Sequence, residues 1–119
     1  MEKENKILDM SFDFSLEIIE LYKILTAQHE YVLSKQILRS GTSIGANVEE
    51  ANAGQTKKDF IAKMSIASKE ARETRYWLRL LDRSQLVKYD YSKHLTSSQH
   101  LINILTKIVK TSQLSLNKK

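Results

Sequence analysis

The stretch KKDFIAKMSIASKEARETRYWLRLLDRS, residues 57 to 84, carries the clearest structural signal in the chain. Its apolar and small residues recur in alternating steps of four and three, at Phe60, Met64, Ala67, Ala71, Thr74, Leu78 and Leu81. On a helix with about 3.6 residues per turn, this spacing returns to one side and leaves the other side polar. The stretch therefore predicts a long amphipathic helix that packs one face against a core.

Three further segments show the same period before and after this stretch. We expect helices at roughly residues 10–27, 30–53, 57–84 and 91–114, with Thr56 or Gln55 capping the third. No segment shows the period of two that marks a half-buried strand, and the chain contains no proline. The connections are short, which favours antiparallel neighbours. The sequence predicts one all-α domain, residues 1–119, folded as an antiparallel up-down-up-down four-helix bundle.

Charge is distributed unevenly along the chain, whose net charge is +5. Residues 1–30 carry seven acids and three lysines, residues 31–90 carry eleven bases and seven acids, and residues 91–119 carry five lysines and no acid. The excess of base in the later helices indicates an anionic partner. No apolar run approaches the ~20 residues needed to span a bilayer, and the opening MEKENK does not resemble a signal peptide. We therefore expect a cytoplasmic protein with no membrane partner.

The segment GTSIG, residues 41–45, matches the G-x-S-x-G pattern of α/β-hydrolases. That pattern presents a nucleophile only at a turn between a strand and a helix, whereas here it falls inside an expected helix. The chain has no cysteine, and its three histidines form no i, i+4 pair, so no metal site and no cofactor are expected. The Arg-x(4 to 6)-His motif of HEPN-type ribonucleases is also absent. We predict a non-enzymatic protein with no catalytic residues and no small-molecule substrate.

Two glycines, Gly41 and Gly45, lie on or beside the apolar face of the second expected helix. A glycine inside a helix costs about 1 kcal/mol relative to alanine, so a gain in packing is expected to offset it. A G-x-x-x-G pair on a packed face lets another backbone approach closely. We therefore expect an unusually close helix contact near Gly41.

A polar stripe, formed by Gln36, Ser43, Asn47 and Glu50, runs beside that apolar face. One interpretation is an ordinary solvated flank. The other is a buried polar network that fixes the register of the helix, because half-buried amides and carboxylates need hydrogen-bond partners. Glu70 and Arg39 are the candidate partners in the second interpretation.

The segment SIGANVEEA and the stretch from Lys57 to Leu81 together resemble a known family. The matching residues are Ser43, Ile44, Asn47, Glu50, Phe60, Ala67, Glu70, Ala71 and the run Tyr76, Trp77, Leu78. They are similar to the "four helix bundle protein" family, whose first known members are encoded in intervening sequences of bacterial 23S ribosomal RNA genes. Members are sometimes called S23 ribosomal proteins. The similarity covers roughly residues 8–110.

The resemblance implies an antiparallel four-helix bundle that assembles as a homopentamer and has no known catalytic activity. A relative in this family, the accessory protein of diversity-generating retroelements, is a basic pentamer that partners a reverse transcriptase and binds nucleic acid. The chain departs from the family pattern at two places. Many members have proline at the position of Gly45, and many begin the first helix with an aromatic cluster that is reduced here to Phe12 and Phe14.

The third expected helix carries a basic strip. Within about 120° of its helical wheel lie Lys58, Lys69, Arg72, Arg75, Arg79 and Arg83, with Tyr76 among them. Cations around one aromatic ring suit contacts with phosphates and stacking on a base. The other interpretations are solvation, or pairing with Glu73, Asp82 or the acidic first helix of a neighbouring subunit.

These features lead to two functional hypotheses. The first is an oligomeric adaptor that associates with RNA, with DNA or with a nucleic-acid enzyme through the basic strip. The second is a structural or protein-binding oligomer with no nucleic-acid role. Ile66 and Trp77 lie beside the core face of the third helix and are candidates for the subunit interface, because tryptophan is favoured in interface anchors. A position for Trp77 inside the subunit's own core is the alternative.

Overall fold

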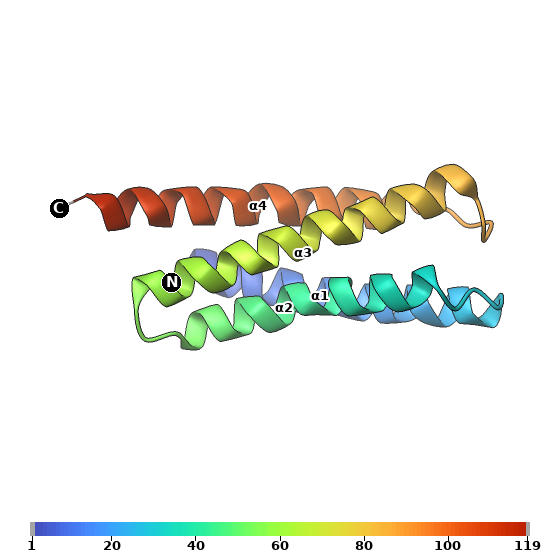
Figure 1. The fold of residues 1–119 in the computed structure, drawn as a ribbon, viewed down its shortest axis with the longest axis horizontal. Coiled ribbons are helices and arrows are strands. Elements are labelled where there is room, and N and C mark those ends of the chain that lie inside the picture. The colour runs from blue at the N-terminus through green and yellow to red at the C-terminus, as the bar shows by residue number, and fades with distance from the viewer. Residues whose placement is uncertain (1, 119) are drawn as a thin grey trace.

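The protein is a bundle of four helices in a computed structural model that describes residues 2–118, with side chains described from Lys6 onward. The helices are α1 (Glu2–Ala27), α2 (Leu33–Ala53), α3 (Lys57–Ser84) and α4 (Ser92–Asn117). No strand occurs between residues 2 and 118, and the molecule is 53 Å long and 22 Å across. The α1–α2 and α3–α4 connections lie at one end, and the α2–α3 connection lies at the other (Figure 1).

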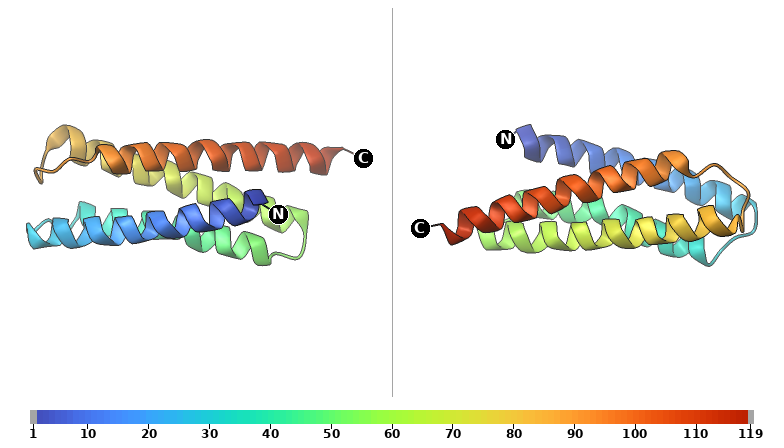
Figure 2. Two further views of the ribbon diagram at one scale, coloured as in Figure 1. Left: turned by 180° about the vertical axis from the view of Figure 1, so that it is seen from behind. Right: turned by 90° about the horizontal axis from the view of Figure 1, so that it is seen from above.

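The helices pack in chain order, α1 on α2, α2 on α3 and α3 on α4. The fourth side of the bundle is looser, because α1 and α4 diverge toward the end that holds both chain termini (Figure 2). As a result, α2 and α3 are each flanked on two sides by close neighbours, whereas α1 and α4 each have one such neighbour.

The prediction of an all-α fold with four helices is confirmed, but three of the expected helix ends were wrong. The first helix begins at Glu2 rather than at residue 10. Its opening residues are mostly charged and show no apolar period, yet Ile7 is fully buried and anchors the added turns in the core. The second helix begins at Leu33 rather than at residue 30, and the fourth continues to Asn117 rather than ending at 114.

Glu30 fixes the connection between α1 and α2. Its carboxylate accepts hydrogen bonds from the backbone N–H groups of Val32, Leu33 and Ser34, at 3.0, 2.9 and 2.7 Å. These amides have no partner within α2, so the acid satisfies them and caps the helix. At the start of α3, Thr56 Oγ1 accepts from the backbone N–H of Asp59 at 3.0 Å, as predicted.

The buried side chains of all four helices form one core. The stripe that predicted α3 is buried from Met64 to Leu81, and only its first member, Phe60, is partly exposed. One polar pair lies inside the core, where Thr74 Oγ1 is hydrogen-bonded to Ser40 Oγ of α2 at 2.8 Å. Both residues have no exposed surface, so this bond joins α2 and α3 away from water.

The close contact expected near Gly41 is present, and its partner is α1. A Cβ atom added at Gly41 would lie 2.8 Å from Cγ1 and 2.9 Å from Cγ2 of Ile18. A Cβ atom added at Gly45 would lie 3.3 Å from both the carbonyl oxygen of Ser11 and Oγ of Ser15. The glycines therefore let α1 lie against the backbone of α2.

The interpretation of the polar stripe on α2 as a buried network was wrong. Ser43 Oγ donates to the carbonyl of Arg39 at 2.7 Å, and Asn47 Nδ2 donates to the carbonyl of Ser43 at 2.9 Å. Glu50 forms a surface ion pair with Lys63 at 3.0 Å. Because side chains of this kind can bond the carbonyl four residues earlier in their own helix, they need no partner on another element.

Candidate nucleic-acid interface

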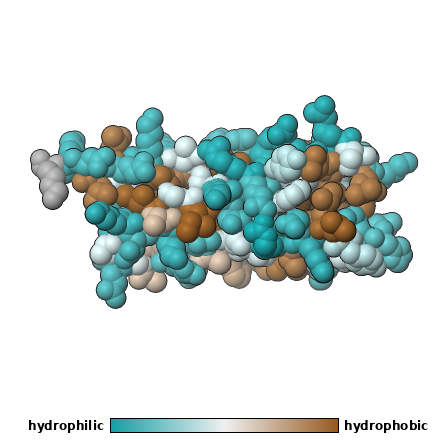
Figure 3. Space-filling view, viewed as in Figure 1, coloured by the Kyte–Doolittle hydropathy of each residue, from teal (hydrophilic) through white to brown (hydrophobic). Residues whose placement is uncertain are grey.

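The basic strip of α3 faces solvent along most of its length. Its exposed cations are Lys58, Lys69, Arg72, Arg79 and Arg83, and Arg75 is half-buried beside α4. Within the strip, Tyr76 is 50% exposed. Figure 3 shows this side of the molecule, where hydrophilic side chains gather in a band over the middle of α3 and α4 between two apolar areas.

The strip does not form the intramolecular ion pairs that were one of its predicted roles. Among the side chains that the structure describes, the salt bridges are made by Lys23, Arg39, Lys63 and Lys93, none of which belongs to the strip. The charges of the strip are therefore available to an anion outside the chain.

Arg39 of α2 explains why Glu73 does not pair with the strip. Arg39 binds Glu70 at 3.3 Å and also binds Glu73. The same Glu73 oxygen accepts a hydrogen bond from Trp77 Nε1 at 3.0 Å. With its carboxylate engaged on the α2 side, Glu73 does not neutralise the arginines on the α4 side. Trp77 itself is partly buried against the core of its own chain, whereas Ile66 is 41% exposed.

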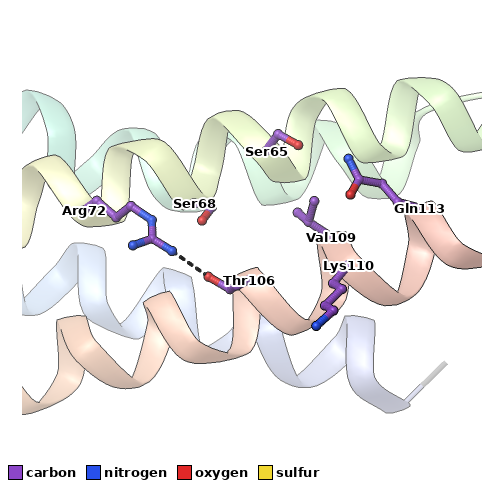
Figure 4. Close-up of a pocket in the computed structure, with 7 residues that line it drawn as sticks. All are labelled: Ser65, Ser68, Arg72, Thr106, Val109, Lys110 and Gln113. Atoms are coloured by element: carbon purple, nitrogen blue, oxygen red, sulfur yellow. Dashed lines mark hydrogen bonds between the residues drawn. The ribbon is translucent and has the colours of Figure 1, made fainter.

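Two adjoining hollows follow the strip where α3 packs against α4. The first has a volume of about 240 Å³ and is lined by Ser65, Ser68, Arg72, Thr106, Val109, Lys110 and Gln113. Figure 4 shows Arg72 reaching from α3 across to α4, where Nη2 donates a 3.0 Å hydrogen bond to Thr106 Oγ1. This bond holds the guanidinium group at the edge of the hollow.

The second hollow has a volume of about 190 Å³, shares Arg72 with the first, and is lined also by Arg75, Tyr76, Arg79, Gln99 and Ile102. Arg75 lines this hollow and is partly exposed, whereas its Nε atom is buried and has no hydrogen-bond partner within the chain. No carboxylate lines either hollow. We call the two hollows together the α3–α4 groove.

The groove contains only part of the predicted strip. Arg72, Arg75, Tyr76 and Arg79 line it, whereas Lys69 and Arg83 lie on α3 outside the two hollows. Lys58 lines a different hollow, near the end of the molecule where α3 begins and α4 ends.

Sequence reasoning missed the contribution of α4, which brings Gln99, Thr106 and Lys110 to the groove. One signal was available, because residues 91–119 carry five lysines and no acid. That count could not show which positions of α4 face α3, since this depends on how the two helices pack.

The described residues hold no group of three or more histidine, aspartate or glutamate side chains that could bind a metal ion. In the same part of the chain, no helix is long and apolar enough to cross a membrane.

A family model described as 23S rRNA-intervening sequence protein matches residues 3–108. The chain belongs to this family. The chain is similar to a protein with unknown function from the S23 ribosomal protein family. That protein comes from Bacteroides thetaiotaomicron VPI-5482, and its crystal structure has been solved. The two chains are 47% identical, with a TM-score of 0.85, over 91% of this chain and 98% of that chain. No curated protein matches the chain. The resemblance predicted from the second and third helices is thus confirmed.

Proposed function

We propose that the protein is a non-enzymatic adaptor that associates with nucleic acid, or with an enzyme acting on nucleic acid, through the α3–α4 groove. The observation that carries this proposal is the set of arginines at the second hollow, Arg72, Arg75 and Arg79, with no carboxylate among its lining residues. A cluster of cations gains affinity for nucleic acid by releasing the counterions condensed on phosphates. Such binding depends on charge and does not read base sequence.

The adaptor is proposed to be an antiparallel up-down-up-down bundle that assembles as a homo-oligomer. An apolar stripe on α1 supports self-association, because Phe12, Leu16 and Ile19 are 63%, 50% and 37% exposed and share one side of the helix. Exposed apolar rows of this kind are usually covered by another molecule, and symmetric assembly covers them with a copy of the same chain. A pentamer is the assembly that the family resemblance suggests.

The second candidate function is a structural or protein-binding oligomer in which the arginines contact a neighbouring subunit. The acidic side of α1 favours it, because Asp9, Asp13, Glu17 and Glu20 could complement the strip of another copy. The two candidates differ in whether the groove stays accessible in the assembled oligomer.

The test is binding of a fluorescent structured RNA, and separately of duplex DNA, as salt rises from about 50 to 200 mM. The key variant replaces Arg72, Arg75 and Arg79 with alanine. Its matched control replaces Lys6, Lys23 and Lys35, which lie on α1 and α2, so the loss of charge is equal. We expect micromolar or tighter binding that falls steeply with salt. Loss of up to three phosphate contacts should lower the slope of log K against log salt by about 2 to 3 in the arginine variant alone.

Light scattering on the same variants separates the two candidates. Binding that is lost in an arginine variant of unchanged oligomeric state supports the nucleic-acid adaptor. Absence of binding by the wild type, or dissociation of the oligomer in the arginine variant, supports the structural alternative.

A further inference from the structure

We infer that the α3–α4 groove binds single-stranded nucleic acid, with phosphates held by its arginines and one base stacked on Tyr76. This inference rests on the proposed function and narrows it to one class of ligand. It follows from the length of the groove, the three arginines at its second hollow and the position of the aromatic ring.

The groove has the extent and the donors that an extended strand requires. From Ser65 to Arg79 it follows α3 for about 21 Å, at a rise of about 1.5 Å per residue. Cations occur along its whole length, with Lys110 in the first hollow, Arg72 between the hollows and Arg79 in the second. Serine, threonine and glutamine side chains lie between them and can donate hydrogen bonds to phosphate and sugar oxygens.

Three arginines give the second hollow the donors that a phosphate group requires. Arg72 and Arg79 lie about one turn away from Arg75 on either side of it along α3. The planar guanidinium group binds a phosphate through two parallel N–H bonds, which a lysine cannot do. A phosphate group in the second hollow would therefore lie among the three arginines that line it.

Tyr76 provides a ring on which a base can stack. It lines the same hollow as Arg75 and is half exposed. Its ring contacts Trp77 in a T-shaped arrangement, with centroids 5.2 Å apart and planes at 67°. Stacking of a base on an aromatic side chain tolerates any base, because every base has a flat face.

The same geometry disfavours a duplex. Bases inside a duplex are already stacked on each other, and their faces cannot reach Tyr76. A helix that reads the bases of duplex DNA lies in the major groove, but α3 is flanked by α2 and α4 and does not project from the bundle, so a duplex would gain the phosphate contacts alone. A single strand needs only the groove between two helices.

The experiment measures fluorescence anisotropy with labelled strands of about 12 nucleotides, within the usual site sizes of about 4 to 16 nucleotides. Its arms are single-stranded RNA, single-stranded DNA of the same sequence, and the RNA duplex. We expect a single strand to bind at least tenfold more tightly than the duplex. The single strand with the lower Kd identifies the type of ligand, and either result supports the inference. Tyr76→Ala should weaken single-strand binding by roughly 5- to 150-fold, whereas Tyr76→Phe should bind as the wild type does.

A second readout in the wild type does not depend on the folding of any variant. Trp77 is the only tryptophan of the chain, and its ring touches Tyr76. Saturation with single strand should therefore change its emission, and an unchanged emission spectrum overturns the inference.

The failures of the two proposals are distinguishable. Equal affinity for duplex and single strand, or unchanged binding by a folded Tyr76→Ala, overturns the single-strand site. The adaptor function survives this result if the arginine variant still loses binding. Poly-glutamate should compete less well with the labelled strand than an unlabelled strand does. If the two compete equally, the inference is overturned, because the groove would then bind any polyanion. Absence of any binding at about 50 mM salt overturns both proposals.

Discussion

Gly41→Ala is expected to destabilise the bundle, although alanine is the better helix former. The new methyl group would lie 2.8 and 2.9 Å from two carbons of Ile18. Carbon atoms in ordinary contact are about 3.5 to 4.0 Å apart, so the new methyl group and the side chain of Ile18 must move apart by about 0.7 Å. Ile18 is fully buried and has no solvent to move into. Overpacking of this kind costs about 1 to 3 kcal/mol, and the gain in helix propensity returns about 1 kcal/mol.

The net loss for alanine is therefore up to about 2 kcal/mol, which lowers Tm by several degrees in a domain of this size. Gly41→Leu should cost more, since its side chain extends further into the same contact. The assay is urea denaturation followed by circular dichroism. Protein concentration must be constant, because the apparent stability depends on it if the proposed oligomer forms.

A double-mutant cycle identifies the contact responsible. Ile18→Ala removes the two carbons and costs about 2 to 5 kcal/mol alone. In that background Gly41→Ala should be close to neutral, because its methyl group enters the space left and then meets the Cβ atom at position 18, which alanine keeps, at 3.2 Å. We expect a coupling energy of at least about 1 kcal/mol. Strictly additive effects would refute the steric argument. Gly45→Ala serves as the control, because its Cβ would meet the carbonyl oxygen of Ser11 and Oγ of Ser15 at 3.3 Å. No atom of Ile18 is among its nearest neighbours, so its effect should not depend on Ile18→Ala.

Two further predictions concern buried polar groups. Thr74→Val leaves the hydroxyl of Ser40 without the partner it has at 2.8 Å and should lower the free energy of unfolding by about 1 to 3 kcal/mol. Adding Ser40→Ala should restore most of that loss, and a further loss in urea denaturation would contradict the role of the pair. Burial lowers the pKa of His94 below the ordinary 6.5, although the charge of Glu17 opposes the shift. His94 therefore binds a proton more readily in the unfolded chain than in the folded one. Its ionisation does not change the free energy of unfolding above about pH 6.5 and lowers it as the pH decreases through that value. We expect a lower Tm at about pH 5.5 than at about pH 7.5, a difference that His94→Gln reduces and His100→Gln retains; a flat wild-type profile would exclude this linkage.

The helical period in the sequence predicted the fold well wherever a helix has one apolar side. It missed the first turns of α1, because a single buried residue, Ile7, anchors them and one residue shows no period. The period also missed the cap on α2. Glu30 lies in the connection before the helix, outside the periodic pattern, and its carboxylate accepts hydrogen bonds from three backbone amides at the start of α2.

The candidate site was predictable in its residue types but not in its shape. The positions of the arginines on α3 followed from the helical wheel. The groove did not, because its second wall is α4 and its depth depends on which α4 residues face Arg72 and Arg75. The polar stripe on α2 shows the same limit. A wheel places Ser43 and Asn47 on one side but cannot show that their side chains bond backward along their own helix.

The fit of Ile18 against Gly41 has a consequence for the alignment of α1 along α2. The glycine forms a slot with no room for a methyl group, and Ile18 fills it. Sliding α1 by one turn, about 5.4 Å, would bring Phe14 or Tyr22 to the slot, and each carries a bulkier aromatic ring. Shifted alignments of α1 are therefore disfavoured by steric clash at Gly41. The bundle needs no buried charge for this, because the shape of the slot alone selects the alignment.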